Sequence, residues 1–286
     1  MKKLCFVIIV WFMVLPGFAR GNIPWGRVMG ADTSSLSAAD KKKAASLMGE
    51  INSYYGCSDS VAKCLKTAPG CLTARHIAGH IVRMVQKGRS EKEIKRAVML
   101  RAKSAHPFKK HKIKPNKAQC IGDPDKAALV IYGYSDFQCP FCTIVLPRLE
   151  AMVKKRSNVA LCFKNFPTLA HGSETVVASI AAVAASMQGK FWAYHNILYK
   201  NRKNQSRSEL IEYAKKIGLD MERFKKDFSS RKAKKIVARE KQEGLSMKVK
   251  GTPTLFFNGK MYFGRKDAAL LSDRMDEELF LSRGKK

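Results

Sequence analysis

The sequence is poor in acidic residues, with 23 Asp and Glu against 54 Lys and Arg, so its formal net charge is +31. A strongly basic surface can bind nucleic acid, anionic envelope polymers or acidic proteins. A single-strand binding groove would interleave its basic residues with aromatic ones, and no basic run of this chain does so. We therefore interpret the charge as a solvated, lysine-rich surface and expect no nucleic acid partner.

Long apolar runs are also missing beyond the first residues of the chain. The start has a basic pair, then an apolar run from Leu4 to Leu15, then small residues that end at Ala19. This pattern is typical of a secretory signal peptide, and the run is shorter than the roughly 20 residues that a membrane-spanning helix needs. We predict a signal peptide at 1–19 and an exported, periplasmic protein.

The first part of the remaining chain has helical patterning. Apolar residues recur at helical spacing within 34–103, and Ser90 with Glu93 forms a capping-box pattern. The segment 104–124 is lysine-rich, contains Pro107 and Pro115, and fits no regular element. We predict a small all-α, cysteine-containing domain at 34–103, followed by a basic linker at 104–124.

The segment 125–286 changes to an α/β pattern. A continuous apolar, β-rich run leads into Cys139, helical spacing follows it, and a second strand ends near Pro167. Several helices are expected at about 171–245. Asn258-Gly259 then marks a hairpin turn, and a last helix follows. The predicted class is therefore α/β, with a helical insertion inside the second domain.

The chain has eight cysteines, and predicted export affects how they can pair. Of the eight cysteines, Cys5 would leave with the signal peptide, which leaves seven. In an oxidising compartment most cysteines can pair, and an odd number leaves at least one thiol outside any intramolecular set. Cys162 lies in the middle of a predicted strand, so we expect it to be a buried, inert free thiol.

The motif "YSDFQCPFC" holds the pair Cys139 and Cys142. A structural zinc site usually needs a second such pair at matched spacing, and there is none. A c-type haem attachment needs His directly after the second cysteine, where this chain has Thr143. Dithiol chemistry remains. It is favoured where a strand leads to the first cysteine and a helix begins behind it, because free backbone N–H groups stabilise a thiolate.

Several motifs together resemble the DsbA-type, thioredoxin-like disulfide oxidoreductases. The resemblance implies a thioredoxin fold with a helical insertion between its second and third strands, cysteine-containing client proteins, a membrane redox partner and no cofactor. The matching stretches lie between Asp125 and about Leu281, in the order found in the family: "YSDFQCPFC", "KNFP", "QGKFWAYHNILY", "YAKKIGLD" and "GTPTLFFNGKMYFG".

The resemblance also implies roles for individual residues. Cys139 becomes the attacking thiolate and Cys142 the resolving thiol. Pro253, after Thr252, matches the cis-proline of the family, whose loop lies against the cysteine pair and presents backbone groups to an extended client peptide. Pro140 and Phe141, the pair between the cysteines, are expected to contact the client as well.

Two positions depart from the family pattern. Strongly oxidising relatives have Pro-His between the cysteines, where this chain has Pro140-Phe141, so the strength of the oxidant stays open. Thioredoxin-like proteins often hold a buried carboxylate six residues before the first cysteine, and this chain has Gly133 there. Asp136 is near in sequence, but strand alternation places it on the other face.

The N-terminal cysteines Cys57, Cys64 and Cys71 are spaced by seven. With His76 and His80 four apart on a predicted helix they allow a metal site, but the cysteine spacing is not a usual zinc pattern. We therefore favour a structural disulfide within the trio and predict no metal. The third cysteine would reach Cys120 or act as a redox relay for the Cys139–Cys142 pair.

The two remaining histidines of interest are predicted to have no catalytic role. His195 lies in the aromatic-rich stretch "FWAYHNILY", which indicates a core or packing position. His171 follows the strand that ends near Pro167, and we expect it to cap or to be solvated.

These observations predict an exported thiol:disulfide oxidoreductase that acts on client proteins, most simply as an oxidant and as a monomer. A disulfide isomerase or reductase is the alternative within the same chemistry. The alternative from another class is a basic envelope binding or chaperone protein whose cysteines are structural.

Overall fold

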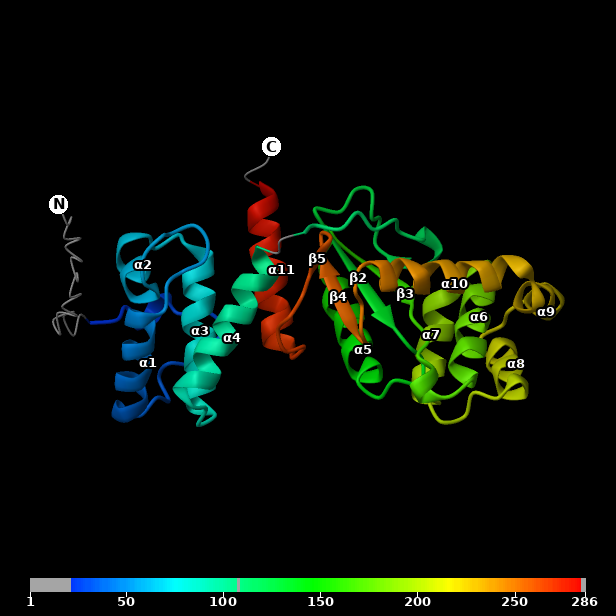
Figure 1. Ribbon diagram of the computed structural model, residues 1–286, viewed down its shortest axis with the longest axis horizontal. Helices are drawn as coiled ribbons and strands as arrows, with labels where there is room; N and C mark the ends of the chain where they lie inside the picture. Colours follow the sequence, from blue (N-terminus) through cyan, green and yellow to red (C-terminus); the bar gives the residue numbers. More distant parts are fainter. Residues whose placement is uncertain (1–21, 107–108, 284–286) are drawn as a thin grey trace, which may run out of the picture. The chain divides into compact units, whose positions relative to one another are not determined.

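The computed structural model describes residues 22–106 and 109–283 (Figure 1). These residues form two compact units, which divide between Arg89 and Ser90. The signal peptide predicted at 1–19 lies outside the described residues. Within the described ranges, every helix is too short or too polar to cross a membrane.

The first unit, up to Arg89, is helical, as its patterning predicted. Its helices enclose a core that includes the fully buried Leu47, Met48, Ile77 and Ile81. Ser37 caps the first helix by accepting a hydrogen bond from the backbone N–H of Asp40, which satisfies one of the free donors at the helix start. The elements are η1 (Trp25–Arg27), α1 (Ala38–Glu50), α2 (Val61–Thr67) and α3 (Leu72–Gln86).

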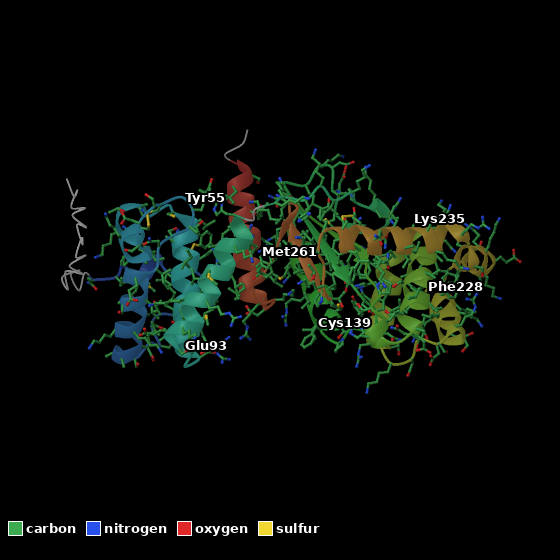
Figure 2. All side chains as sticks on the ribbon, in the orientation of Figure 1. Tyr55, Glu93, Cys139, Phe228, Lys235 and Met261 are labelled. Atoms are coloured by element: carbon green, nitrogen blue, oxygen red, sulfur yellow. A yellow bond between two sulfur atoms is a disulfide. The ribbon has the colours of Figure 1, made fainter. Side chains whose placement is uncertain are left out.

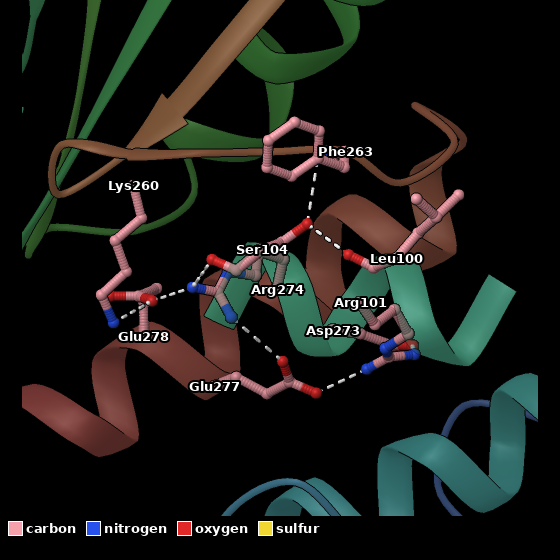
Figure 3. A network of polar contacts seen from close by, with 9 residues as sticks. All are labelled: Leu100, Arg101, Ser104, Lys260, Phe263, Asp273, Arg274, Glu277 and Glu278. Carbon is pink, nitrogen blue, oxygen red and sulfur yellow. Dashed lines mark hydrogen bonds and ion pairs between the residues drawn. The ribbon is translucent and has the colours of Figure 1, made fainter. Parts of the chain in front are cut away.

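Helix α4 (Glu91–Ala105) belongs to the second unit. Its Arg101 is buried and ion-paired with Asp273, at 3.0 Å, and with Glu277, at 2.5 Å, both on the last helix, α11 (Ala268–Arg283) (Figure 3). Removing one partner of such a buried network lowers the free energy of unfolding by about 3 to 5 kcal/mol, because the remaining charges are left uncompensated. These contacts group α4 with the unit that follows it along the chain.

The compact units therefore divide before the basic linker that the sequence predicted at 104–124. The predicted linker 104–124 starts within the last turn of α4. It also contains a short helix, η2 (Lys117–Gln119), and the two-residue strand β1 (Cys120–Ile121). Elements this short have no periodicity from which a sequence pattern could be recognised.

A five-stranded sheet forms the centre of the second unit, and the predicted α/β class is confirmed. The strand order is β1-β3-β2-β4-β5. β2 and β3 are parallel, and the other neighbouring pairs are antiparallel. β2 and β3 are buried along their whole length, as continuous apolar runs predict. The longer strands are β2 (Leu129–Ser135), β3 (Val159–Asn165) and β4 (Thr254–Phe257), and β5 (Lys260–Met261) completes the hairpin.

Successive side chains of β2 enter two different cores, because they point to opposite faces of the sheet. Leu129 and Ile131 belong to the larger core, which also takes residues from α5 (Cys142–Val153) and from the helices inserted after β3. Val130 and Tyr132 belong to a smaller core on the other face, together with Phe256 of β4. Both faces of the sheet are thus covered.

The predicted helical insertion is present between β3 and β4. Figure 1 shows α6 to α9 packed together beyond the end of the sheet, with α10 leading back towards β4. The helices of this insertion are α6 (Glu174–Ser186), α7 (Phe191–Lys200), α8 (Arg207–Lys216), α9 (Met221–Ser229) and α10 (Arg231–Ser246), and η3 (Leu169–His171) precedes α6.

The hairpin predicted at Asn258-Gly259 is confirmed. Both residues have positive φ, +48° and +79°, the combination that a two-residue hairpin turn requires. β4 pairs with β2 so that Thr254 lies opposite Tyr134, close to the end of β2. This register brings the chain just before β4 beside the residues that follow β2.

Candidate active site

Cys139 lies in the turn that connects β2 to α5 (Figure 2). The helix begins at Cys142, and Phe141 directly before it already has helical backbone angles. The backbone N–H groups of Phe141 and Cys142 donate hydrogen bonds to the sulfur of Cys139. The N–H of Cys142 also donates to the carbonyl oxygen of Cys139, at 3.1 Å, so this sulfur and this carbonyl group share the donors of the helix start.

The surroundings of Cys139 favour its thiolate. They lower the pKa of the thiol from 9.0 to about 5, with the hydrogen bond from the Cys142 thiol as the largest cause. The side chain of Thr252 and the two backbone N–H groups lower the pKa further, and burial opposes them. Cys139 is 2% exposed. A sulfur with this pKa is ionised at neutral pH and is both a good nucleophile and a good leaving group.

Cys142 has the opposite tendency. Its side chain is fully buried, and burial raises the pKa of its thiol well above 9.0. Its hydrogen-bond partners besides Cys139 are the hydroxyl of Ser135 and the backbone N–H of Asp136. The two thiols therefore share one proton unequally, with the charge on the outer sulfur and the proton on the inner one.

The loop before β4 contacts the cysteine pair. The thiol of Cys139 lies 3.3 Å from the carbonyl oxygen of Thr252, and the peptide bond between Thr252 and Pro253 is cis. Pro253 is buried, whereas Thr252 is half-buried. The structure thus brings the Thr252–Pro253 loop to Cys139, although Thr252 lies 113 residues further along the chain.

Three exposed apolar side chains lie on segments around Cys139: Phe141 (68% exposed), Ile144 (54%) and Leu169 (69%). Pro140 is exposed as well. Leu169 is next to Thr168, whose backbone N–H binds the turn before Cys139 through the carboxylate of Asp136. The sequence singled out Pro140 and Phe141 but missed Ile144 and Leu169, because their residue types give no sign of exposure.

A pair of buried hydroxyl groups lies behind Cys142, and sequence reasoning missed it. Ser135, at the end of β2, and Tyr199, on α7 of the insertion, have their oxygen atoms 2.7 Å apart, and Ser135 also contacts the Cys142 thiol. Burial raises the pKa of the Tyr199 phenol well above 10.0, so it stays a hydrogen-bond donor. At Gly133, which stands where a buried carboxylate was looked for, methyl groups of Leu146 and Leu255 lie 2.9 and 3.7 Å from where a Cβ would stand.

Asp136 is fully buried beyond the end of β2 and joins the loop after β3 to the active-site turn. Its carboxylate accepts hydrogen bonds from the backbone N–H of Thr168, at 2.8 Å, from the Thr175 hydroxyl, and from the backbone N–H of Gln138. Nδ1 of His171 lies 2.9 Å from the same carboxylate. His171, which was expected to cap or to be solvated, is half-buried and contacts Asp136, because the loop after β3 folds back.

His195 is a core residue, as predicted. It is fully buried among Phe137, Phe163, Trp192 and Tyr199, and burial lowers its pKa to about 4. It is therefore neutral at physiological pH.

The remaining cysteines only partly follow the sequence prediction. A disulfide joins Cys57 and Cys64, as expected within the trio, and Cys71 is a buried free thiol. Cys162 was predicted to be free, which is wrong, because it forms a disulfide with Cys120. β1 places Cys120 directly opposite Cys162 on β3, so Cys120 is not the partner of Cys71.

The first unit also contains His76 and His80, both buried on α3. Among the residues that the structure describes, no three or more His, Cys, Asp or Glu side chains converge as metal ligands would.

Comparison with known proteins places residues 130–276 in the family described as DSBA-like thioredoxin domain. Among curated relatives, the chain is 29% identical over 172 residues to "Probable disulfide bond formation protein D" of Bacillus anthracis, covering 56% of this chain and 78% of that protein. It is 28% identical over 152 residues to "Na(+)/H(+) antiporter NhaA 3" of Salinispora tropica, covering 53% of this chain but only 23% of the antiporter.

Among solved structures, BdbD from Bacillus subtilis in its oxidised form aligns with a TM-score of 0.52 at 20% identity, over 60% of this chain and 98% of that one. This likeness concerns the fold, which agrees with the sheet and the helical insertion described above. Because the family match covers more than half of the sequence, the chain belongs to the DSBA-like thioredoxin domain family, a family of thiol:disulfide oxidoreductases.

Proposed function

We propose that this protein is an exported thiol:disulfide oxidoreductase that oxidises the cysteines of client proteins through Cys139 and Cys142. The observation that carries the proposal is the opposed acidity of the two thiols, with the pKa of Cys139 lowered to about 5 and that of Cys142 raised. Their order along the chain, with the acidic sulfur first and at a helix start, suits a nucleophile followed by a resolving thiol.

The low pKa of Cys139 supports an oxidant and not a reductant. A stabilised thiolate exists only in the reduced enzyme, so it draws the equilibrium from the disulfide towards the reduced pair. Relative to a thiol of pKa 9.0, a pKa of about 5 stabilises the reduced state by roughly 3 kcal/mol at pH 7. That corresponds to a potential more oxidising by roughly 60 mV.

The proposed reaction starts from the Cys139–Cys142 disulfide. A client thiolate attacks the sulfur of Cys139, the S–S bond breaks, and the electron pair passes to the sulfur of Cys142. The second client thiolate then attacks the client sulfur of the mixed disulfide and releases Cys139 as a thiolate. The client loses two electrons to form its disulfide, and the enzyme gains them as one thiolate and one thiol.

Ser135 and Tyr199 supply a setting for the charge that develops on Cys142. Ser135 can donate its hydroxyl hydrogen to this sulfur while it accepts the hydrogen of Tyr199, 2.7 Å away. The ammonium group of Lys266 also interacts electrostatically with Cys142, and burial lowers the pKa of this lysine. These groups are in place before the reaction, so they stabilise the leaving thiolate without reorganisation.

The client would bind across the Thr252–Pro253 loop and the exposed side chains of Pro140 and Phe141. The carbonyl group of Thr252 contacts Cys139, so an extended peptide lying along this loop brings its own cysteine to the reacting sulfur. Contacts through the backbone and through a broad apolar surface select for extended peptides and not for one sequence.

Export, a membrane redox partner and a monomeric state complete the proposal. The residue pattern of 1–19 supports export. A membrane partner would reoxidise the Cys139–Cys142 pair after each turnover. Because the chain spans about a quarter of the length of the antiporter relatives, their activity is not transferred to it.

Trapping the mixed disulfide tests the proposal. In a Cys142→Ala variant the resolving thiol is missing, so incubation with a peptide disulfide should leave one peptide bound to Cys139, detectable by mass spectrometry. The matched Cys139→Ala variant, which keeps Cys142, should trap at least about tenfold less, since Cys142 is buried and protonated. Equal trapping by both variants, or none by either, would contradict the assignment.

A further inference from the structure

The first unit contains a thiol and a disulfide in one small cluster. Cys64 and Cys71 are both buried and pack together with Ala74, and Cys57 packs against them. Cys57 and Cys64 are bonded to each other, and Cys71 is free. Three sulfur atoms thus share one site that plays no part in the proposed chemistry of Cys139 and Cys142.

Local structure keeps Cys71 close to the disulfide. Its thiol lies 3.4 Å from the carbonyl oxygen of Tyr55, a residue labelled in Figure 2. It is also 3.3 Å from the position where a Cβ on Gly56 would lie, directly before Cys57 in the chain. The backbone N–H of Ala68 donates to the carbonyl oxygen of Cys64, and the backbone N–H of Cys71 donates to the carbonyl oxygen of Ala68. Short turns therefore connect Cys64 to Cys71.

We propose that this cluster is a second thiol–disulfide exchange centre, in which the disulfide moves between Cys57–Cys64 and Cys64–Cys71. The Cys71 thiol loses its proton to the solvent, and its thiolate attacks the sulfur of Cys64. A Cys64–Cys71 bond forms and the Cys57–Cys64 bond breaks. The electron pair leaves on Cys57, which takes up a proton, so the exchange needs no external oxidant or reductant.

The spacing of the cysteines favours a balanced exchange. Cys57 and Cys64 are seven residues apart, and so are Cys64 and Cys71. The loop-closure entropy that a disulfide removes from the unfolded chain depends on the number of residues in the loop. It is therefore equal for the two pairings, and only local packing in the folded unit distinguishes them.

The exchange changes which sulfur is accessible. Cys71 is buried, whereas Cys57 is half-buried. Moving the disulfide to Cys64–Cys71 therefore replaces an enclosed thiol with one that solvent reaches. The substrate class that such a thiol takes is a disulfide, on a small thiol or on a protein, which it would attack to form a mixed disulfide.

Peptide mapping of the full chain tests the exchange. A background of Cys139→Ser with Cys142→Ser removes the proposed catalytic pair, so every signal comes from other cysteines. Iodoacetamide labels free thiols under native conditions at pH 8, acid stops the exchange, and trypsin follows. Lys63 and Lys66 separate the three cysteines into different peptides, so each pairing has its own mass. We expect Cys64–Cys71 in at least one tenth of the chains, with the label on Cys57.

Two variants in that background separate exchange from simple reduction. With Cys71→Ser, the label on Cys57 should fall at least tenfold, because its thiol arises only through Cys71. With Cys57→Ser, glutathione disulfide should produce the Cys64–Cys71 bond. The Cys120–Cys162 disulfide is an internal control, because its cluster contains no third cysteine, and it should stay intact.

The proposal is overturned if Cys57–Cys64 remains the sole pairing of the three cysteines at every time point. Labelling of Cys57 that is unchanged by Cys71→Ser would also overturn it. The pairing is first mapped with Cys57, Cys64 and Cys71 all present. That result therefore decides the question even if the Cys71→Ser or Cys57→Ser variant fails to fold. None of these outcomes depends on whether Cys139 and Cys142 act as an oxidant.

Discussion

Two pairs of cysteines lie in the second unit, but their backbone surroundings differ. Cys120 and Cys162 lie opposite each other on β1 and β3, and Cys162 is also aligned with Tyr132 of β2 in the sheet. Cys139 and Cys142 lie where β2 has ended and α5 begins, and two backbone N–H groups bind the sulfur of Cys139. Within a sheet the backbone donors bind carbonyl groups, whereas at a helix start they are free to stabilise a thiolate.

The comparison shows that position in the fold, and not burial, separates a structural from a reactive cysteine. Cys162 is fully buried and Cys139 is 2% exposed, so the two are almost equally enclosed. Only Cys139 has donors that favour the charged form.

Removing each pair should affect catalysis very differently. We expect Cys139→Ala to lower the rate of oxidation of a dithiol peptide by about 1000-fold or more, because the nucleophile is lost. The double variant Cys120→Ala with Cys162→Ala should stay within about threefold of the wild type, because it leaves the helix start unchanged. The measurement is the initial rate at equal enzyme concentration. A comparable loss in both variants would remove the distinction.

The effect on stability should have the reverse order. The Cys120–Cys162 disulfide closes a loop of 42 residues. Removing this cross-link should lower the free energy of unfolding by about 4 kcal/mol. Cys139→Ala deletes no cross-link in the reduced protein, so it should cost about 1 kcal/mol at pH 5, where the thiolate contributes little to the stability of the fold. Urea titration of both variants, with folding checked at zero denaturant, measures the difference. A double variant as stable as the wild type would show that this disulfide has no structural role.

The hydroxyl groups behind Cys142 should tune the rate without being essential. We expect Tyr199→Phe to slow the formation of the mixed disulfide about tenfold, because one hydrogen bond to Ser135 is lost as charge develops on Cys142. Tyr194→Phe is the matched control, since it removes another fully buried hydroxyl of α7, which instead donates to the carbonyl oxygen of Leu210. Equal slowing in both variants would indicate general damage to α7.

The acidity of Cys139 should depend on its partner thiol. In the reduced wild type, the rate of alkylation of Cys139 should be constant well above pH 5 and fall about tenfold per pH unit below it, because only the thiolate reacts. Cys142→Ala removes the largest cause of the lowered pKa, so we expect the midpoint to rise by about one pH unit. An unchanged midpoint would assign the lowered pKa to the helix start alone.

The same lowered pKa determines how the stability of the reduced protein varies with pH. Because the pKa of Cys139 is lower in the folded protein than in the unfolded chain, its thiolate stabilises the fold fully above pH 9. This stabilisation is lost as the pH falls from 9 to about 5. Urea titrations of the reduced protein at pH 5.5 and pH 8.5 should show this change, and Cys139→Ala should lack it.

Features set by neighbouring residues could be predicted from the sequence. The strand before Cys139 and the hairpin at Asn258-Gly259 have strong local patterns, and both are present. The approach of Thr252 to Cys139 came from the family resemblance and not from any local pattern. It depends on the pairing of β4 with β2, which brings together residues more than a hundred positions apart.

Other features depend on contacts that no local pattern signals. β1 has only two residues, so its pairing with β3, and with it the Cys120–Cys162 disulfide, could not be anticipated. Tyr199 reaches Ser135 from α7, 64 residues further along the chain. His171 contacts Asp136 only because the loop after β3 folds back. Each of these unpredicted contacts involves a side chain whose partner is determined by the tertiary fold.

A redox titration of both pairs in one sample, using glutathione buffers, alkylation and mass spectrometry, compares them directly. We expect Cys139–Cys142 to exchange readily, with a potential nearer roughly −120 mV than −270 mV, while Cys120–Cys162 remains a disulfide below roughly −300 mV. A Cys139–Cys142 pair near −270 mV would indicate a reductase. A pair that never exchanges would contradict the proposed enzyme and leave a protein with structural cysteines.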